Sequence, residues 1–269
     1  MIIDTHTHIF PDKIASKTVE ALATKSSTLP YSDGTEKGLL LAMERAGVDI
    51  SLALPVLTKP TQFDSITAFA LGVNERYKDE KRRIISFGGI HPDCDDVYAK
   101  LVYLKENGVK GIKIHPDYQG TFIDDERFIR IISIAKELDL IVVTHAGVDV
   151  GFLDMPVRCT PERAKKVIKA TGHKKLVFAH YGGYLMWKEV LDTLCGEDVY
   201  FDTGYTFNSI DDNTFKEILA RHGDDKILFA TDSPWQDLKT CVDKVKSLNL
   251  GKVTEQKIFY KNAIKLLGE

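Results

Sequence analysis

Two histidines close to the N-terminus, His6 and His8, are spaced to bind one metal ion. They end an apolar stretch that begins at Ile2. If this stretch forms a β-strand, its side chains alternate between two faces, so Asp4, His6 and His8 share one face. The two imidazoles would then lie about 7 Å apart at the carboxyl end of the strand. Neutral imidazole is the commonest side-chain metal ligand. Two ligands do not complete a site, so later segments must supply the others.

Apolar stretches alternate with amphipathic stretches along the chain. Runs rich in Val, Ile, Leu and Phe predict buried parallel strands, and apolar residues at helical spacing predict helices between them. Strands are expected at residues 1–8, 50–57, 83–91, 109–115, 140–145, 175–180, 199–203 and 227–232. Helices are expected at residues 13–25, 35–46, 64–77, 95–106, 124–137, 161–172, 184–194, 212–221, 238–247 and 254–267, with Thr160 as the N-cap of the sixth.

Eight strand–helix units in 269 residues are typical of a (β/α)8 barrel, a TIM barrel. The competing fold is a doubly wound open sheet, which usually has a Gly-rich turn after its first strand. The sequence His6-Thr7-His8-Ile9-Phe10 occupies that place here. No linker divides the chain, so we expect one domain covering residues 1–269.

Most histidines follow the predicted strands. Catalytic groups of barrel enzymes come from the carboxyl ends of several strands, which meet at one rim. Here that rim would collect His6, His8, His91, Lys113, His115, His145, His180 and Asp232. So many polar groups in one cleft cost stability unless something binds them, and a divalent metal ion would do so. The other two histidines, His173 and His222, end predicted helices, where a partial positive charge suits the helix dipole, so we interpret them as structural or solvated.

Composition limits the partners and the compartment. The net charge of −3 and the isoelectric point near 6.3 give no reason to expect nucleic acid or an anionic membrane as partner. The apolar runs are shorter than the roughly 20 residues that span a bilayer. The four cysteines lie far apart and are expected to be reduced thiols. We therefore expect a cytoplasmic protein that acts on a small molecule.

Several longer motifs resemble those of the amidohydrolase superfamily of metal-dependent barrel enzymes. The nearest branch is the amidohydrolase-related one, which includes the aminocarboxymuconate-semialdehyde and resorcylate-type decarboxylases. The matching motifs, in the family's order, are Asp4-Thr5-His6-Thr7-His8, Gly111-Ile112-Lys113-Ile114-His115-Pro116, Thr144-His145-Ala146-Gly147, Phe178-Ala179-His180-Tyr181-Gly182-Gly183 and Ala230-Thr231-Asp232-Ser233-Pro234-Trp235.

The resemblance implies that His6, His8, His145 and Asp232 bind one divalent ion per chain. Three imidazoles and a carboxylate favour zinc, with manganese, iron and nickel as alternatives. The ion would lower the pKa of its bound water toward about 7. Asp232 would accept the proton of this water, and His180 would hydrogen-bond or polarise the substrate carbonyl. Family members are often dimers or larger, so a homodimer is one expected oligomeric state.

Lys113 and His115 lie two residues apart, so both should face the barrel interior. In binuclear relatives a lysine at this place is carboxylated and bridges two metals. Lys113 could do so, or it could pair with a substrate carboxylate or with Asp4. The candidate substrate-binding residues are Lys113, His115, His91, Arg158, Tyr184 and Trp235.

Three functions follow from these residues. We favour metal-assisted hydrolysis of an amide, a lactone or a related C–N or C–O bond, because hydrolysis is the commoner chemistry of the superfamily. The alternative is non-oxidative decarboxylation of an aromatic or unsaturated carboxylic acid. A third function is that of a metal-binding barrel without catalysis. The retention of His180 beside all four expected ligands argues against it.

Overall fold

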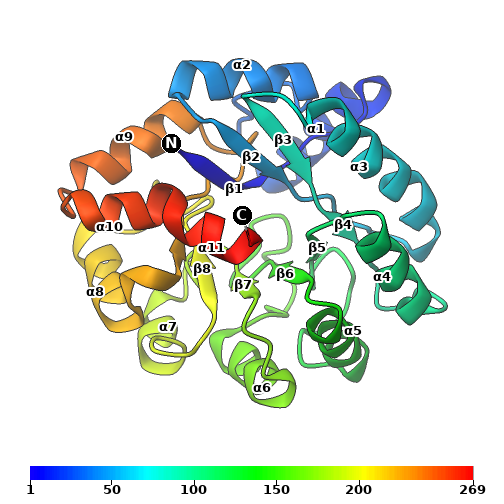
Figure 1. Cartoon of the computed structure of the whole chain (residues 1–269). Coiled ribbons are helices and arrows are strands. Elements are labelled where there is room, and N and C mark those ends of the chain that lie inside the picture. The colour runs from blue at the N-terminus through cyan, green and yellow to red at the C-terminus, as the bar shows by residue number, and fades with distance from the viewer. Residues whose placement is uncertain (269) are drawn as a thin grey trace.

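The computed structural model describes residues 1–268, arranged as a ring of helices around a central barrel of strands (Figure 1). The domain expected over residues 1–269 ends at Glu269, which lies outside the described residues. The strands are β1 (Ile3–Thr7), β2 (Ile50–Ala53), β3 (Arg83–Ser86), β4 (Gly88–Gly89), β5 (Gly111–Ile114), β6 (Ile141–Thr144), β7 (Leu176–Phe178), β8 (Tyr200–Asp202) and β9 (Ile227–Leu228).

The strand pairs within residues 1–268 are all parallel. They form two ladders, β1-β2-β3 and β4-β5-β6-β7-β8-β9. Only Phe87 separates β3 from β4, and its backbone N–H still donates to the carbonyl of Ala53 on β2 at 2.9 Å. The two segments are therefore one barrel strand with a local break, and nine described segments fill eight barrel positions.

The barrel closes where the chain returns to β1. The backbone N–H of Thr5 donates to the Phe229 carbonyl at 2.9 Å, and that of Asp232 donates to the His6 carbonyl at 2.8 Å. An open sheet would leave these two edges apart. The predicted (β/α)8 barrel is therefore confirmed, and the doubly wound sheet is excluded. Closure also brings Asp232 next to His6, although 226 residues separate them in the sequence.

The helices match the predicted ones to within a few residues. They are α1 (Asp12–Ser26), α2 (Glu36–Ala46), α3 (Phe63–Tyr77), α4 (Val97–Glu106), α5 (Glu126–Glu137), α6 (Pro161–Thr171), α7 (Trp187–Thr193), α8 (Asp212–His222), α9 (Leu238–Ser247), α10 (Lys252–Gln256) and α11 (Asn262–Leu267). Thr160 is confirmed as the N-cap of α6, because its hydroxyl accepts from the N–H of Arg163 at 3.3 Å. The predicted helix at 254–267 is divided by a π-helical turn at Lys257–Lys261.

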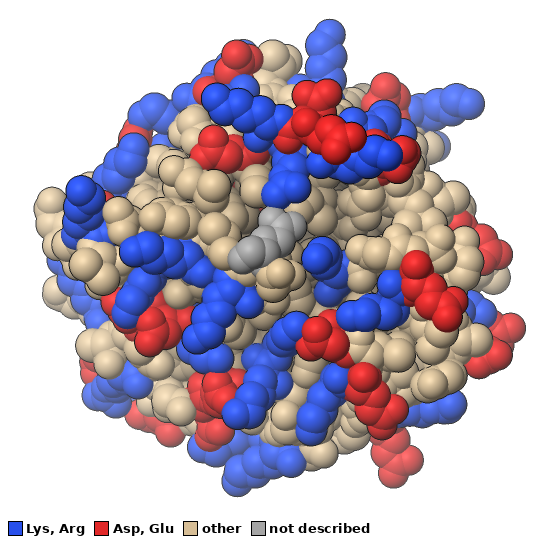
Figure 2. Space-filling model, viewed as in Figure 1, with Lys and Arg blue, Asp and Glu red and all other residues tan. Residues whose placement is uncertain are grey.

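Apolar side chains fill the barrel at the amino ends of its strands. Ile3, Leu52 and Phe87 belong to this inner cluster, and α11 contributes Ala263 and Leu266 to it. Helix α11 thereby covers this end of the barrel, as Figure 1 shows at the C-terminus. On the face that carries α10 and α11, basic and acidic side chains are interspersed (Figure 2). With this end packed, the carboxyl ends of the strands are left to form a site.

None of the helices within residues 1–268 is long and apolar enough to cross a lipid bilayer.

His173 and His222 are buried core residues. His222 Nε2 lies 3.0 Å from the Val199 carbonyl, its Nδ1 accepts from the Gly196 N–H at 3.3 Å, and its ring stacks on Phe201 with centroids 3.8 Å apart. Burial lowers the pKa of His222 to about 4 and also lowers that of His173. Their structural interpretation therefore fits, but the suggested charge at the helix ends is wrong, because both rings are neutral at pH 7.

Replacing His222 with Gln should flatten the dependence of stability on pH. The ring has a pKa of about 4 in the folded chain and about 6.5 when unfolded, so the unfolded state binds more protons. The wild-type protein therefore loses up to about 1.4 kcal/mol of stability from this group for each pH unit between 6.5 and 4. Urea unfolding at pH 7.5, 6 and 5 measures the slope. An identical slope in both proteins would contradict the assignment.

Candidate metal centre

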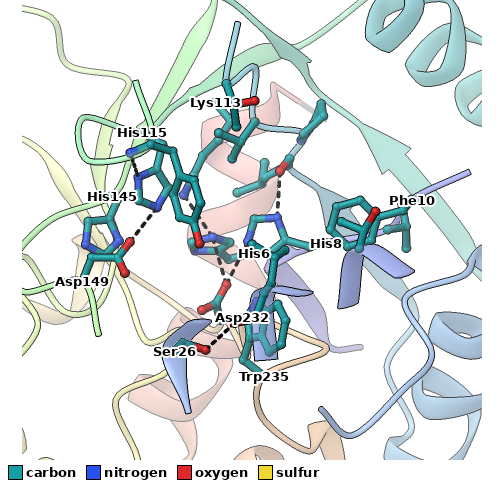
Figure 3. A pocket seen from close by; sticks show the side chains of 18 of the residues that line it. His6, His8, Phe10, Ser26, Lys113, His115, His145, Asp149, Asp232 and Trp235 are labelled. Atoms are coloured by element: carbon teal, nitrogen blue, oxygen red, sulfur yellow. Dashed lines mark hydrogen bonds and ion pairs between the residues drawn. The ribbon is translucent and has the colours of Figure 1, made fainter. Parts of the chain in front are cut away.

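Three predicted ligands meet at the carboxyl-terminal mouth of the barrel. His6 and His8 come from the end of β1, and Asp232 follows β9 (Figure 3). One ligand atom from each of the three lies within 4.8 Å of the other two. His6 Nε2 is 3.3 Å and His8 Nε2 is 3.0 Å from the same carboxylate oxygen, Asp232 Oδ1. The centre is thus built from the two chain segments whose pairing closes the barrel.

Hydrogen bonds show which nitrogen of the His6 ring carries the proton. His6 Nδ1 lies 3.0 Å from the Asp202 carboxylate, and His8 Nδ1 lies 2.9 Å from the Leu54 carbonyl. Both partners are acceptors, and the Lys113 ammonium can donate to His6 Nε2, so the hydrogen of His6 lies on Nδ1. Burial holds the pKa of His6 well below its usual range, so its ring is neutral. His6 Nε2 therefore presents a lone pair, whereas both ring nitrogens of His8 face acceptors, with Nε2 3.0 Å from Asp232 Oδ1, where a metal ion would take the place of the shared hydrogen.

This convergence of electron-rich atoms fits a divalent metal ion. Two imidazole lone pairs and a carboxylate oxygen repel one another when no proton or cation lies among them. Lys113 partly relieves this repulsion, because its Nζ lies 3.0 Å from His6 Nε2. A divalent ion would bind all three atoms at once, and nitrogen and carboxylate oxygen are suitable ligands for zinc and manganese. The described residues can therefore bind a divalent metal at this point.

Two site residues have strained backbones. His180 and Asp232 adopt left-handed conformations, with φ of 57° and 62°, at the ends of β7 and β9. This conformation costs a residue other than glycine roughly 1–2 kcal/mol. The Asp232 N–H is held by the His6 carbonyl, and the His180 N–H donates to Asp202 Oδ1 at 3.1 Å. The strain turns both side chains into the mouth of the barrel.

Asp202 was missed by the sequence reasoning. It ends β8, where we had assigned no polar residue. Its Oδ2 binds His6 Nδ1, and its Oδ1 accepts from the N–H groups of His180 and Gly204. The side chain is fully buried. In the sequence, Asp202 directly follows the apolar run Val199-Tyr200-Phe201. An acidic residue after an apolar run is also the pattern that indicates Asp232.

The fourth predicted ligand, His145, lies in a neighbouring cluster. Its Nδ1 is 2.9 Å from His180 Nε2, and its ring stacks on that of His115 with centroids 4.4 Å apart. His145 groups with His115 and Asp149 as a second set of closely spaced ligand atoms. Its Nε2 is buried and has no hydrogen-bond partner among the described residues. The structure thus brings together three of the four predicted ligands and leaves a free lone pair on the fourth.

His180 is an acceptor at Nε2, which faces His145 Nδ1 at 2.9 Å. Its Nδ1 lies 2.8 Å from the Gly204 carbonyl and so carries the hydrogen, which leaves the lone pair on Nε2. Burial lowers the pKa of His180 to about 4, so the ring is neutral near pH 7. This tautomer has no N–H on the cavity side. The geometry therefore does not fit the predicted hydrogen bond from His180 to a substrate carbonyl.

Lys113 is buried in the site and does not pair with Asp4. Asp4 instead accepts from the N–H and the hydroxyl of Thr231, at 3.0 and 2.6 Å, which ties β1 to the segment after β9. The suggested Lys113–Asp4 pair is not formed, because the Lys113 ammonium lies 3.0 Å from His6 Nε2 instead. Burial lowers the pKa of Lys113 to about 8, against the opposing effect of Asp202 and Asp232.

The site opens into a cavity of about 470 Å³. Of the candidate substrate-binding residues, Lys113, His115, Tyr184 and Trp235 line it. Tyr118, Tyr205 and Asp149, which sequence reasoning missed, also line it. Burial raises the pKa of Asp149, whose Oδ2 lies 3.5 Å from His115 Nε2. Tyr118 follows β5, Asp149 follows β6 and Tyr205 follows β8. All three lie in loops without a periodic sequence pattern, so periodicity does not indicate them.

Gly147 allows two of these loops to approach. Its φ is +87°, and a Cβ atom there would lie 2.0 Å from the backbone nitrogen of Tyr184. Only glycine fits this contact, through which the segment after β6 reaches the segment after β7.

His91 and Arg158, two predicted substrate-binding residues, are not among the described residues that line the cavity. Arg158 is directed to the buried carboxylate of Asp117, with Nη1 3.5 Å from Oδ1. His91 Nδ1 accepts from the N–H of Asp93 at 3.1 Å. The geometry therefore does not fit a substrate contact for either side chain, because local partners determine their orientation.

Comparison with known proteins identifies a family. The family model described as "Amidohydrolase" matches residues 3–268. No curated protein matches the chain.

Solved structures of the same architecture are similar to nearly the whole chain. A 2,6-dihydroxybenzoate decarboxylase from Rhizobium has a TM-score of 0.72 at 16% identity, covering 99% of this chain and 98% of that one. A 5-carboxyvanillate decarboxylase from Novosphingobium aromaticivorans, solved with manganese, has a TM-score of 0.72 at 16% identity and covers 100% and 96%. An uncharacterised TIM-barrel protein from Bordetella bronchiseptica has a TM-score of 0.77 at 15% identity and covers 99% and 98%.

These comparisons contradict the expectation of hydrolysis. Among the similar structures, those whose activity is named are mostly decarboxylases, which favours the alternative. The error has a physical cause. Hydrolysis and decarboxylation would use the same metal ligands, so those residues could not distinguish the two reactions.

Replacing Asp202 with Asn should weaken metal binding by about 10–100-fold. The neutral amide no longer holds the His6 Nδ1 hydrogen by charge, so His6 Nε2 is less strongly directed at the metal. Zinc or manganese affinity of the chelator-treated protein, measured by competition with a chromophoric chelator, tests this expectation. Asp211→Asn is the matched control, since Asp211 is an exposed N-cap of α8. Equal affinity of Asp202→Asn and wild type would contradict the role.

Proposed function

Because the chain belongs to the amidohydrolase family of enzymes, we propose that it is a metal-dependent decarboxylase of a small aromatic or unsaturated carboxylic acid. One observation carries the proposal. The His6–His8–Asp232 cluster and the Lys113 ammonium share one cavity whose other walls include Tyr118, Tyr184, Tyr205 and Trp235. This combination suits a flat anion, because cations attract its carboxylate while aromatic side chains contact its ring. The similarity to dihydroxybenzoate and carboxyvanillate decarboxylases supports it.

His6, His8, His145 and Asp232 are the proposed ligands of a single ion. His145 would join by rotating its ring, and its unpartnered Nε2 supports this step. Zinc remains our proposal for the metal, and manganese, present in the carboxyvanillate decarboxylase structure, is the alternative. When bound, the ion supplies positive charge that holds the substrate's oxygen atoms. The position of Lys113 at His6 favours pairing with the substrate carboxylate over a metal-bridging role.

Lys113 is the proposed anchor for the substrate carboxylate. It is the one lysine or arginine among the described residues that line the cavity, and only 1% of it is exposed. A charge pair in a site of such low polarity is stronger than one in water. With a pKa of about 8, the side chain remains mostly protonated at pH 7. It would therefore attract the carboxylate before the reaction and hold it close to the metal centre.

Decarboxylation needs proton transfer but no oxidant. The bond between the ring carbon and the carboxylate breaks, carbon dioxide leaves, and the electron pair that remains on the carbon takes a proton. Asp149 is a proposed proton donor, because burial raises its pKa and it lies next to His115. We retain Asp232 and His180 as catalytic residues. Once the proposed rotation of His145 withdraws its Nδ1, the neutral Nε2 of His180 can accept the proton of a substrate hydroxyl.

The test is carbon dioxide release from a panel of carboxyl-labelled hydroxybenzoates by metal-loaded protein. We expect labelled carbon dioxide without any added oxidant. Replacing Lys113 with Met should lower kcat/KM by at least about thirtyfold, since it leaves the substrate carboxylate unpaired at a cost of about 2 kcal/mol. Lys110→Met is the matched control, because Lys110 is exposed and precedes the same strand, β5. Substrate loss with incorporation of oxygen from labelled water and no carbon dioxide would contradict the proposal.

A further inference from the structure

The cavity continues beyond the metal centre into an apolar arm between α1 and α3. We define the arm by the side chains of Phe10, Ile14, Leu22, Val56, Ile66 and Phe69, all of which line the cavity. In Figure 3, Phe10 lies on the far side of His8 from His145. The charged residues among the described lining, Lys113, Asp149 and Asp232, are all at the metal end.

Helix α1 presents two apolar faces. Ala15 and Val19 are buried against the protein. Ile14, Thr18 and Leu22, four residues apart, form a second stripe that lines the cavity. Ile14 is 51% exposed. A surface helix normally buries one apolar stripe and exposes polar residues opposite. The second stripe of α1 is therefore left for something that enters the cavity.

Two features fix α1 in place as a wall. Lys25 near its end has its ammonium 3.3 Å from the centroid of the Phe152 ring and 4.7 Å from that of Tyr118, which are cation–π contacts. Just before the helix, the Phe10 N–H donates to the Gly34 carbonyl at 2.8 Å. The opposite wall is α3, whose Ile66 and Phe69 are three residues apart and face the arm. The arm is thus preformed between two helices.

We propose that the substrate carries an apolar substituent, an alkyl or aryl group of several carbons, that occupies this arm. The inference rests on the proposed function for the other end of the molecule, where the metal centre and Lys113 hold the carboxylate. A cavity of about 470 Å³ lies within the range of about 300–1,000 Å³ that encloses drug-sized ligands. A substrate with a charged group at this distance from its carboxylate would be selected against, because the arm offers it no charged partner among the described residues.

The experiment separates binding in the arm from chemistry at the metal. Affinities are measured by calorimetry for 2-nitrophenols, which resemble hydroxybenzoates but cannot lose carbon dioxide. Unbranched alkyl chains of zero to four carbons are placed meta or para to the nitro group, in two series. Burial of each methylene should tighten binding about fourfold in at least one series. Carbon dioxide release is measured separately with the corresponding alkylated hydroxybenzoates. If the nitrophenols bind more tightly as the alkyl chain lengthens but no carbon dioxide is released, the proposal for the arm is supported and only the proposed decarboxylation is overturned.

Variants locate the effect in the arm. Replacing Leu22 and Ile66 with Gln should remove most of the gain in affinity per methylene, because both half-buried side chains line the arm. Leu41→Gln is the control, since Leu41 is 45% exposed on α2 outside the cavity lining. It should retain the full gain per methylene. Affinity that is independent of chain length in both series would overturn the proposal, and so would an unchanged gain in the Leu22→Gln/Ile66→Gln protein.

Discussion

The hydrogen bond between His6 Nδ1 and Asp202 Oδ2 is the interaction on which the site depends. It places the lone pair of His6 on Nε2, opposite Asp232, where Nε2 of His8 also points. The other oxygen of Asp202 accepts from the backbone of His180 and Gly204 and so supports the left-handed conformation of His180. One buried carboxylate therefore sets the tautomer of one residue and the backbone of another, and the rest of the cavity is arranged around the result.

The barrel makes this arrangement possible by closing on itself. Pairing of β1 with the segment after β9 brings Asp232 to His6, and the contact of Asp4 with Thr231 reinforces the same seam. Apolar packing under α11 fills the opposite end of the barrel. Polar chemistry is thereby confined to one mouth, whose apolar extension lies between α1 and α3. The long segment between β1 and β2 thus builds one wall of the cavity.

The sequence predicted the elements well because their signals are local. Periodicity located the eight barrel strands and the main helices, but it missed the break at Phe87, the 3-10 turns at 60–62 and 224–226 and the π-helical turn at 257–261. Alternation along a strand placed His6 and His8 on one face, and the carboxyl ends of the strands placed Asp232 at the same rim. Side-chain direction was harder to predict, because distant partners determine it. Asp117 draws Arg158 away from the cavity, and His180 holds His145. No sequence pattern indicates either contact. No pattern in the sequence distinguishes hydrolysis from decarboxylation either.

The most direct test of the central claim is an anomalous diffraction map of the crystallised protein, purified without chelator and supplied with zinc or manganese. We expect a single strong peak about 2.0–2.3 Å from His6 Nε2, His8 Nε2 and a carboxylate oxygen of Asp232, with the His145 ring turned toward it. A peak bound only by His115, His145 and Asp149, or no peak at the mouth of the barrel, would contradict the claim that the convergent lone pairs at Asp232 form the metal centre.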